Sequence, residues 1–317
     1  MSERTSTSDT TGHVDRPFPG LAPPVRAIVS DALPPHDRSL PVALCTIAGE
    51  VGAETVPDRE LESGSRAVDR RLEPVTNAVT SFEGYARIRH DLLVTDRYDR
   101  DDDRDAAVLA SDYLHAAAYT MLDEAPVSDR RTLELYRIMI DGSTALSHRF
   151  LSWTDGDGPT GTADCPPEAT LAETATALGA AAVGATSDVR SAMDAYGHAL
   201  TTALSVTPSS DAPRETAVRV LTGRESLETS ADGDTPSRGW ASVQARRHDP
   251  SAVTSHLERA REALSRLTRR VDGTDATPVG SESVSETQPS GGPYGSPVAR
   301  LRRATRIPFQ DVPSTDE

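Results

Sequence analysis

The chain has 317 residues, 36% of them hydrophobic, which is enough for the core of one large domain. Its formal net charge is −16, and all 33 of its basic residues other than histidine are arginine. The absence of lysine excludes a P-loop lysine, a Schiff-base amine and a Ser-Lys dyad, and the acidity argues against nucleic-acid binding. An acidic chain with only 4% aromatic residues is typical of a salt-adapted protein, because molar salt shortens the Debye length to roughly 3 Å and screens self-repulsion.

The first twenty residues are polar and lack the apolar stretch of a secretory signal. No segment approaches the ~18 consecutive apolar residues of a membrane-spanning helix, so we expect a cytoplasmic protein. Cys45 and Cys165 are far apart in sequence and indicate neither a disulfide framework nor a cysteine-rich zinc site.

Composition divides the chain into three parts. Residues 1–20 are rich in Ser, Thr and Asp and are expected to be a disordered tail, and residues 21–271 form the helical domain. Residues 272–317 are expected to be mostly disordered, with a short basic segment at Arg300–Arg306 that we interpret as a flexible, counter-charged tail.

Apolar residues recur at helical spacing through residues 21–271, with little alternation of the kind seen in strands, so we predict an all-α fold. In chain order, the expected helices are Val25–Leu33, Pro41–Ala53, Ser65–Val94, Asp105–Glu124, Ser128–Trp153, Pro167–Ala185, Asp188–Val206, Ala212–Leu221 and Pro250–Val271.

Capping and breaking residues mark several of these boundaries. Ser128 and Asp188 are expected to be N-caps, and Pro167 fits the first turn of its helix. Pro74 is expected either to kink its helix or to divide it in two. Asp96–Asp105, DRYDRDDDRD, alternates acids with arginines and is expected to be a solvated acidic loop rather than a displaced metal motif.

Four segments resemble, in the same order, helices of the trans-isoprenyl diphosphate synthases, also called polyprenyl synthetases. Val108–Met121 (VLASDYLHAAAYTM), Leu171–Gly184 (LAETATALGAAAVG) and Asp194–Val206 (DAYGHALTTALSV) carry most of the resemblance, and Leu40–Gly52 matches more loosely. The resemblance implies an isoprenoid synthase-like bundle of about ten helices. The chain looks like a degenerate, haloarchaeal-like member of that family.

In that family, two aspartate-rich motifs on facing helices hold magnesium ions that bind the allylic diphosphate and assist its departure. A trianionic leaving group needs hard cations, which in turn need several carboxylate oxygens. Carboxylates four residues apart lie on one face of a helix, so the DDxxD spacing presents them together.

The first aspartate-rich motif should fall at Ile88–Asp96, and it is incomplete there. Asp91 can stand for one carboxylate, but Leu92 replaces the second and Thr95 occupies the position four residues after Asp91. Asp96 is one residue out of register, which turns it about 100° around a helix.

The second motif and the family's basic residues are also missing. After Val206 no carboxylate occurs until Asp211. The family's GGKxxR segment corresponds to Pro35–Leu40, where an acid replaces the lysine, Leu40 replaces the later arginine and Arg38 alone keeps a positive charge. Its Lys-Thr pair corresponds to Pro167-Glu168, which lacks the positive charge.

Because of these substitutions, we predict that the site lacks the residues needed for prenyl transfer. We assign no catalytic residue, no metal site and no cofactor, and we predict a vestigial ligand site formed by Arg38, His90, Asp91, Asp96, Asp112 and Tyr113.

The preferred function is a non-catalytic isoprenyl diphosphate synthase-like protein, acting as a regulatory or partner subunit or binding an apolar isoprenoid chain. One alternative is an active prenyltransferase whose rearranged site binds magnesium through Asp91, Asp96 and the acidic loop. Another is a scaffolding helical bundle. We also expect a homodimer, or a heterodimer with an active prenyl synthase, through the helices around Asp112 and Gly142.

Overall fold

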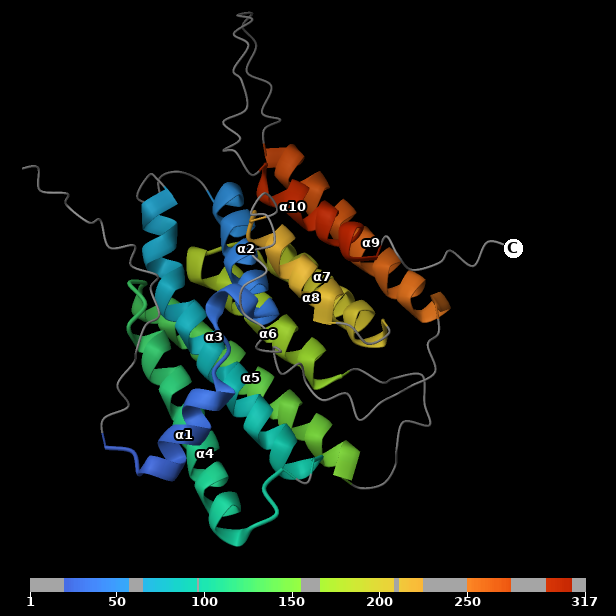
Figure 1. Ribbon diagram of the computed structural model, residues 1–317. Coiled ribbons are helices and arrows are strands. Elements are labelled where there is room, and N and C mark those ends of the chain that lie inside the picture. Colours follow the sequence, from blue (N-terminus) through green and yellow to red (C-terminus); the bar gives the residue numbers. More distant parts are fainter. Residues whose placement is uncertain are drawn as a thin grey trace, which may run out of the picture.

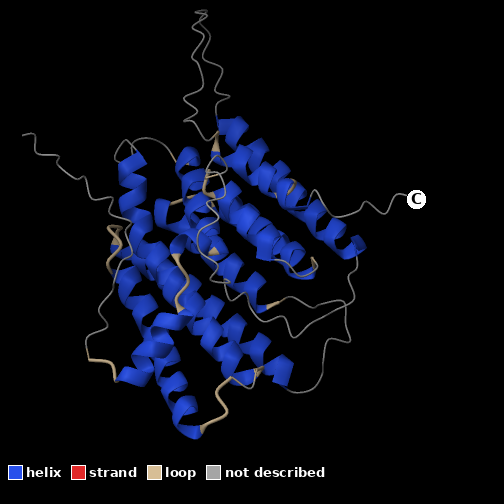
Figure 2. Ribbon diagram, viewed as in Figure 1, coloured by secondary structure: helices blue, strands red, loops and turns tan. Residues whose placement is uncertain are grey.

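The computed structural model describes residues 20–56, 65–95, 97–154, 166–207, 211–224, 250–274 and 295–309. These residues form ten α-helices and contain no strand, which confirms the predicted all-α fold (Figures 1 and 2). The helices are α1 (Pro23–Ala32), α2 (Leu40–Thr55), α3 (Ser65–Leu93), α4 (Asp101–Asp123), α5 (Asp129–Thr154), α6 (Pro167–Val183), α7 (Ser187–Val206), α8 (Asp211–Leu221), α9 (Pro250–Thr274) and α10 (Pro297–Ala304), with short 3-10 helices η1 (His36–Arg38) and η2 (Ile307–Phe309).

Pro74 does not divide its helix, and the starts of α4 and α7 differ from the sequence predictions. Helix α3 continues through Pro74 as one helix, because the apolar face that follows the proline is buried in the core and outweighs the lost backbone hydrogen bond. Helix α4 starts at Asp101, inside the predicted loop, because acidic side chains in a first turn stabilise a helix N-terminus. The N-cap of α7 is Thr186 rather than Asp188, since the Thr186 side chain accepts a hydrogen bond from the Val189 amide.

Helices α2 and α6 form the centre of the bundle. They pack against each other, with α3 on one side and α7 on the other; α4 covers α3, and α9 covers α7 (Figure 1). The close approach depends on Gly179 of α6, where an added Cβ would lie 2.0 Å from the carbonyl oxygen of Cys45 in α2. Cys45 is a buried, free thiol, and burial raises its pKa to about 12, so it fills space as a small apolar residue.

The prediction of a flexible basic tail is wrong for residues 297–309. Leu301 and Ala304 of α10 are fully buried against the bundle, and the Tyr196 hydroxyl donates a hydrogen bond of 2.9 Å to the Leu301 carbonyl. Arg300 donates to the Leu221 carbonyl at 2.8 Å and pairs with Glu50 of α2. This segment forms a packed helix because its apolar face is buried against the bundle and the Arg300 side chain binds Leu221 and Glu50.

The predicted disordered segments mostly lie outside the described residues, namely 1–19, 275–294 and 310–317. Within the described ranges, no helix combines the length and the apolar character needed to cross a bilayer.

One carboxyl group couples the packing of α6 and α7 to pH. Burial raises the pKa of Asp194 in α7 to about 7, although Thr176 of α6 donates a hydrogen bond of 3.2 Å to its Oδ1. Nearby Glu173 raises the pKa further. Between the ordinary pKa of an aspartate and pH 7, the folded state therefore binds a proton that the unfolded state has lost.

We expect this linkage to make stability fall as pH rises from 5 to 8, because ionising Asp194 penalises only the folded state. Relative to the Asp194→Asn variant, the wild-type protein should lose about 2 kcal/mol of unfolding free energy over that interval. Urea denaturation of both proteins at the two pH values measures the difference. Parallel pH profiles for the two proteins would show that Asp194 is not the responsible group.

Candidate functional site

Polar side chains gather where the second half of α3 faces the start of α2, the start of α6 and α8. We call this group the α3 polar cluster; its members are Ser39, Glu83, Arg87, His90, Glu168 and Arg214. Its ionisable side chains come from α3, α6 and α8; Glu83 and His90 are buried, and Arg87, Glu168 and Arg214 are half-buried.

Glu83 is the most deeply buried charge of the cluster. It is fully buried on α3, and its Oε2 accepts a hydrogen bond of 2.5 Å from the Ser39 hydroxyl while its Oε1 pairs with Arg87 Nη2 at 2.7 Å. The Ser39 oxygen also accepts from the Val42 amide and caps α2. The carboxylate is thus satisfied from both sides and joins α3 to the start of α2.

Glu168 brings a second acid into the cluster, from the first turn of α6. Burial raises its pKa, and the positive charges of Arg214, His90 and Arg87 act in the opposite direction. The pKa of Glu168 is raised overall, because burial outweighs these neighbours. Pro167-Glu168, where the resemblance places the family's Lys-Thr pair, therefore offers no positive charge.

Asp91 lies next to the cluster at the end of α3. Its Oδ2 accepts a hydrogen bond of 2.8 Å from Arg97, and its Oδ1 lies 3.6 Å from Nδ1 of His90. Burial by itself raises the pKa of Asp91, but His90 and Arg97 outweigh it and hold the pKa below its ordinary value. Arg97 also pairs with Asp31 of α1, so Asp91 belongs to a network that fixes the end of α3.

The positions beside Asp91 have become structural. Leu92 is buried in the core, and the Thr95 hydroxyl donates a hydrogen bond of 3.0 Å to the Asp91 carbonyl. Asp96 lies outside the described residues. One carboxylate oxygen of Asp91 is bonded to Arg97 and the other lies beside the His90 ring, so the residues described here do not fit a magnesium ion. Among the described side chains, no three His, Cys, Asp or Glu residues form a group that could hold a metal.

The end of α7, where the second aspartate-rich motif is expected, carries no carboxylate in its last described turn, Ala203–Thr207. Hydroxyl groups there bond to the helix itself: Ser205 donates to the Thr202 carbonyl and Thr207 donates to the Ala203 carbonyl, each at 2.8 Å. Residues 208–210 lie outside the described residues.

The other predicted site residues are spread around the cluster. Arg38 is exposed in η1, directly before Ser39. Asp112 is exposed on α4 and pairs with Arg89 of α3 at 2.7 Å, and Tyr113 beside it is half-buried. The structure therefore brings His90 and Asp91 together and links Asp112 to the neighbouring face of α3.

Four members of the cluster were not predicted from the sequence, namely Ser39, Glu83, Arg87 and Arg214. One signal was available: Glu83 interrupts an apolar stretch and stands four residues before Arg87, a spacing that favours an ion pair. The charged position within that stretch could have indicated a buried pair. Nothing in the sequence indicates that Arg214 faces Glu168.

The bundle is similar to a known class of enzymes. The crystal structure of a geranyltransferase from Legionella pneumophila matches it with a TM-score of 0.52 and 14% sequence identity, covering 80% of this chain and 84% of that chain. The chain thus has an isoprenyl diphosphate synthase-like fold, which confirms the fold predicted from the resemblance. The amino-acid sequence matches no protein-family model and no curated protein.

Proposed function

We propose that the protein is a non-catalytic isoprenyl diphosphate synthase-like subunit that associates with an active prenyl synthase. The observation that carries this proposal is the state of Asp91. Its two carboxylate oxygens face Arg97 and His90, and the neighbouring Leu92 is part of the core.

Prenyl transfer requires that a departing diphosphate be neutralised, usually by metal ions that several carboxylates hold. In this chain Glu83 of the α3 polar cluster is committed to Arg87 and Ser39. Among the described residues, no group of three His, Cys, Asp or Glu side chains could hold a metal ion. This supports a structural role for the former site.

An apolar stripe on α5 supports association with another subunit. Leu133, Ile140 and Leu151 are exposed and lie within about 20° of one another around the helix, and Leu109 is exposed on neighbouring α4. Gly142, which the sequence analysis placed at the interface, is buried against Thr174 of α6. We therefore assign the interface to the α5 stripe, defined as Leu133, Ile140 and Leu151.

Mixing the protein with an active prenyl synthase from the same cell tests the proposal. Light scattering in molar salt should show a complex heavier than either protein alone, and the synthase should change its rate or product length by at least twofold. The Leu133→Glu/Ile140→Glu variant should lose both effects, because charge on the stripe opposes its burial.

Leu93→Glu is the matched control, since Leu93 is an exposed leucine on another helix, α3. It should associate as the wild-type protein does. A protein that stays monomeric both alone and with the synthase would contradict the proposed association.

A further inference from the structure

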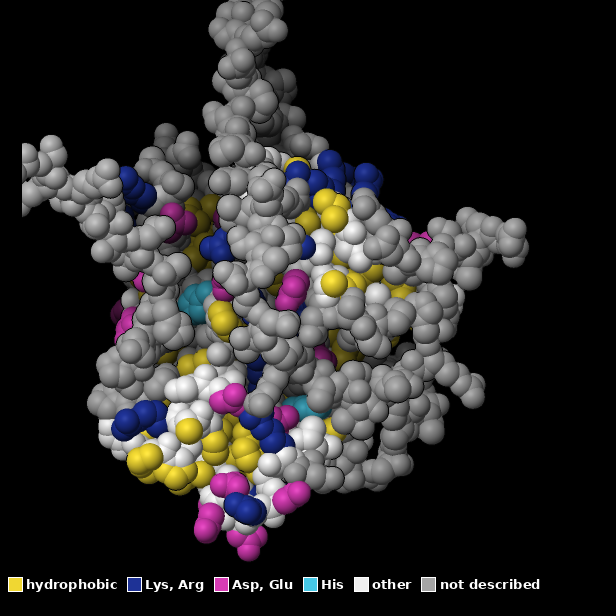
Figure 3. Space-filling view, viewed as in Figure 1, with side chains coloured by type: hydrophobic (Ala, Val, Ile, Leu, Met, Phe, Trp, Pro, Cys, Tyr) yellow, Lys and Arg dark blue, Asp and Glu magenta, His cyan; other side chains and the backbone are white. Residues whose placement is uncertain are grey.

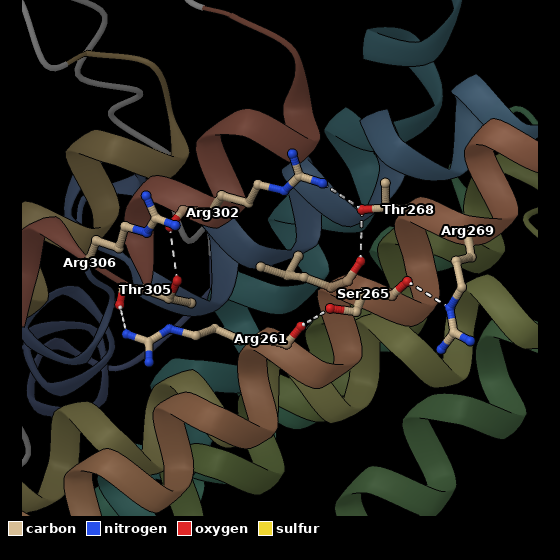
Figure 4. Close-up of a pocket in the computed structure, with 8 residues that line it drawn as sticks. Arg261, Ser265, Thr268, Arg269, Arg302, Thr305 and Arg306 are labelled. Carbon is tan, nitrogen blue, oxygen red and sulfur yellow. Dashed lines mark hydrogen bonds between the residues drawn. The ribbon is translucent and has the colours of Figure 1, made fainter.

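A basic hollow of about 430 Å³ lies on the outer side of the bundle, between α9 and the α10 segment. Four arginines line it, namely Arg261 and Arg269 from α9 and Arg302 and Arg306 from α10 and the turn after it (Figure 4). Dark-blue side chains gather over this part of the molecule in Figure 3. None of the residues that line this hollow belongs to the α3 polar cluster, although α8, which carries Arg214, packs against α10.

Hydrogen bonds to neutral oxygens position three of these arginines. Arg261 donates to the Thr305 carbonyl at 3.3 Å, Arg302 to the Thr268 hydroxyl at 3.0 Å, and Arg269 to the Ser265 carbonyl at 3.2 Å. Each of these bonds uses one of the five donors of a guanidinium group. The remaining donors are left for another acceptor.

The charge of the hollow is unusual for this chain. Within the described residues, none of the four arginines forms an ion pair with an acid, whereas Arg266 on the same helix pairs with Glu262 at 2.6 Å. The whole chain carries a net charge of −16, so four gathered arginines without an ion pair to a described acid stand out from the rest of the surface. Among the described residues, acidic side chains approach Arg269, which lies near Glu262 and lines a second hollow with Asp188. Holding like charges together is unfavourable unless an anion joins them.

We propose that this hollow binds a small soluble diphosphate or phosphate ester. Guanidinium groups present paired N–H donors that match phosphate oxygens, and the Ser265 and Thr268 hydroxyls lie between the arginines as further polar contacts. The volume falls in the range of sites for small molecules. A concave site suits a compact anion better than a flat membrane surface. The proposal does not depend on the partner-subunit role.

Calorimetric titration of the full chain with inorganic diphosphate, at constant ionic strength in chloride buffer, tests this site. We expect saturable binding of one diphosphate per chain. Arg302→Gln/Arg306→Gln should weaken it at least tenfold, and so should Arg269→Gln, which leaves α10 unaltered. Arg259→Gln is the matched control, an exposed arginine of α9 outside the hollow, and should bind as the wild-type protein does.

Circular dichroism checks that each variant is folded. Absence of saturable binding, or equal weakening by Arg259→Gln, would overturn the proposal. Vesicles of phosphatidylglycerol provide a second arm: binding to vesicles without binding to soluble diphosphate would also overturn it, since the ligand would then be a membrane surface.

Discussion

Replacing Glu83 with alanine is expected to destabilise the protein by about 3 kcal/mol. Removing one partner of a buried ion pair leaves the other charge without compensation, which typically costs about 3–5 kcal/mol, and the partial exposure of Arg87 places this case at the lower end. The Ser39 hydroxyl would also lose its acceptor, and with it the link between α3 and the start of α2. Urea denaturation in molar salt measures the change.

Glu262→Ala is a matched control, because Glu262 and Arg266 form the same pairing four residues apart on a helix, at 2.6 Å, but in solvent. Exposed pairs contribute little, so this variant should unfold at the same urea concentration as the wild-type protein. If both variants lost the same stability, burial of the Glu83 pair would not be the cause.

The second large effect concerns the contact between the two central helices. Gly179→Ala is expected to cost about 3 kcal/mol, because the added Cβ would lie 2.0 Å from the Cys45 carbonyl oxygen and a helix backbone cannot move away locally. Helices α2 and α6 would have to separate along much of their length.

Gly49→Ala provides the comparison, since its Cβ would meet only the end of the Leu72 side chain, at 2.5 Å. A side chain can change rotamer, and alanine favours the helix by about 0.5–1 kcal/mol over glycine. This variant should therefore lose clearly less stability than Gly179→Ala in the same urea titration. The reverse order would contradict the proposed packing of α2 on α6.

Helical periodicity made the fold predictable from α1 to α9. Each of these helices has an apolar face and a recognisable start or stop, such as Pro167 at the first position of α6. Helix α10 was not predicted from the sequence, because it is only eight residues long and rich in arginine. Two signals for it are present in the sequence: Ser296 is a residue type that caps helices, and Leu301 and Ala304 are spaced to lie on one helix face. In the structure Ser296 accepts a hydrogen bond from the Ala299 amide, and both apolar residues are buried.

The candidate site was predictable only in part. The sequence shows that Leu92 replaces a carboxylate, because that substitution is local and has a fixed register. The electrostatic influence of Arg214 and His90 on Glu168 depends on how α6, α8 and α3 are arranged, and no local sequence pattern encodes that arrangement. The vestigial ligand site therefore stays a prediction, whereas the α3 polar cluster beside it was found only in the structure.

We propose that the protein does not catalyse prenyl transfer, because Asp91 is held by Arg97 beside His90 and Leu92 replaces its neighbouring carboxylate. The most direct test of this proposal is the formation of prenyl product by the purified protein alone, from isopentenyl diphosphate and an allylic diphosphate, in magnesium and molar salt, with an active synthase as the positive control. We predict no product above the background of the protein-free reaction. Steady, magnesium-dependent product formation that Asp91→Asn abolishes would contradict the account.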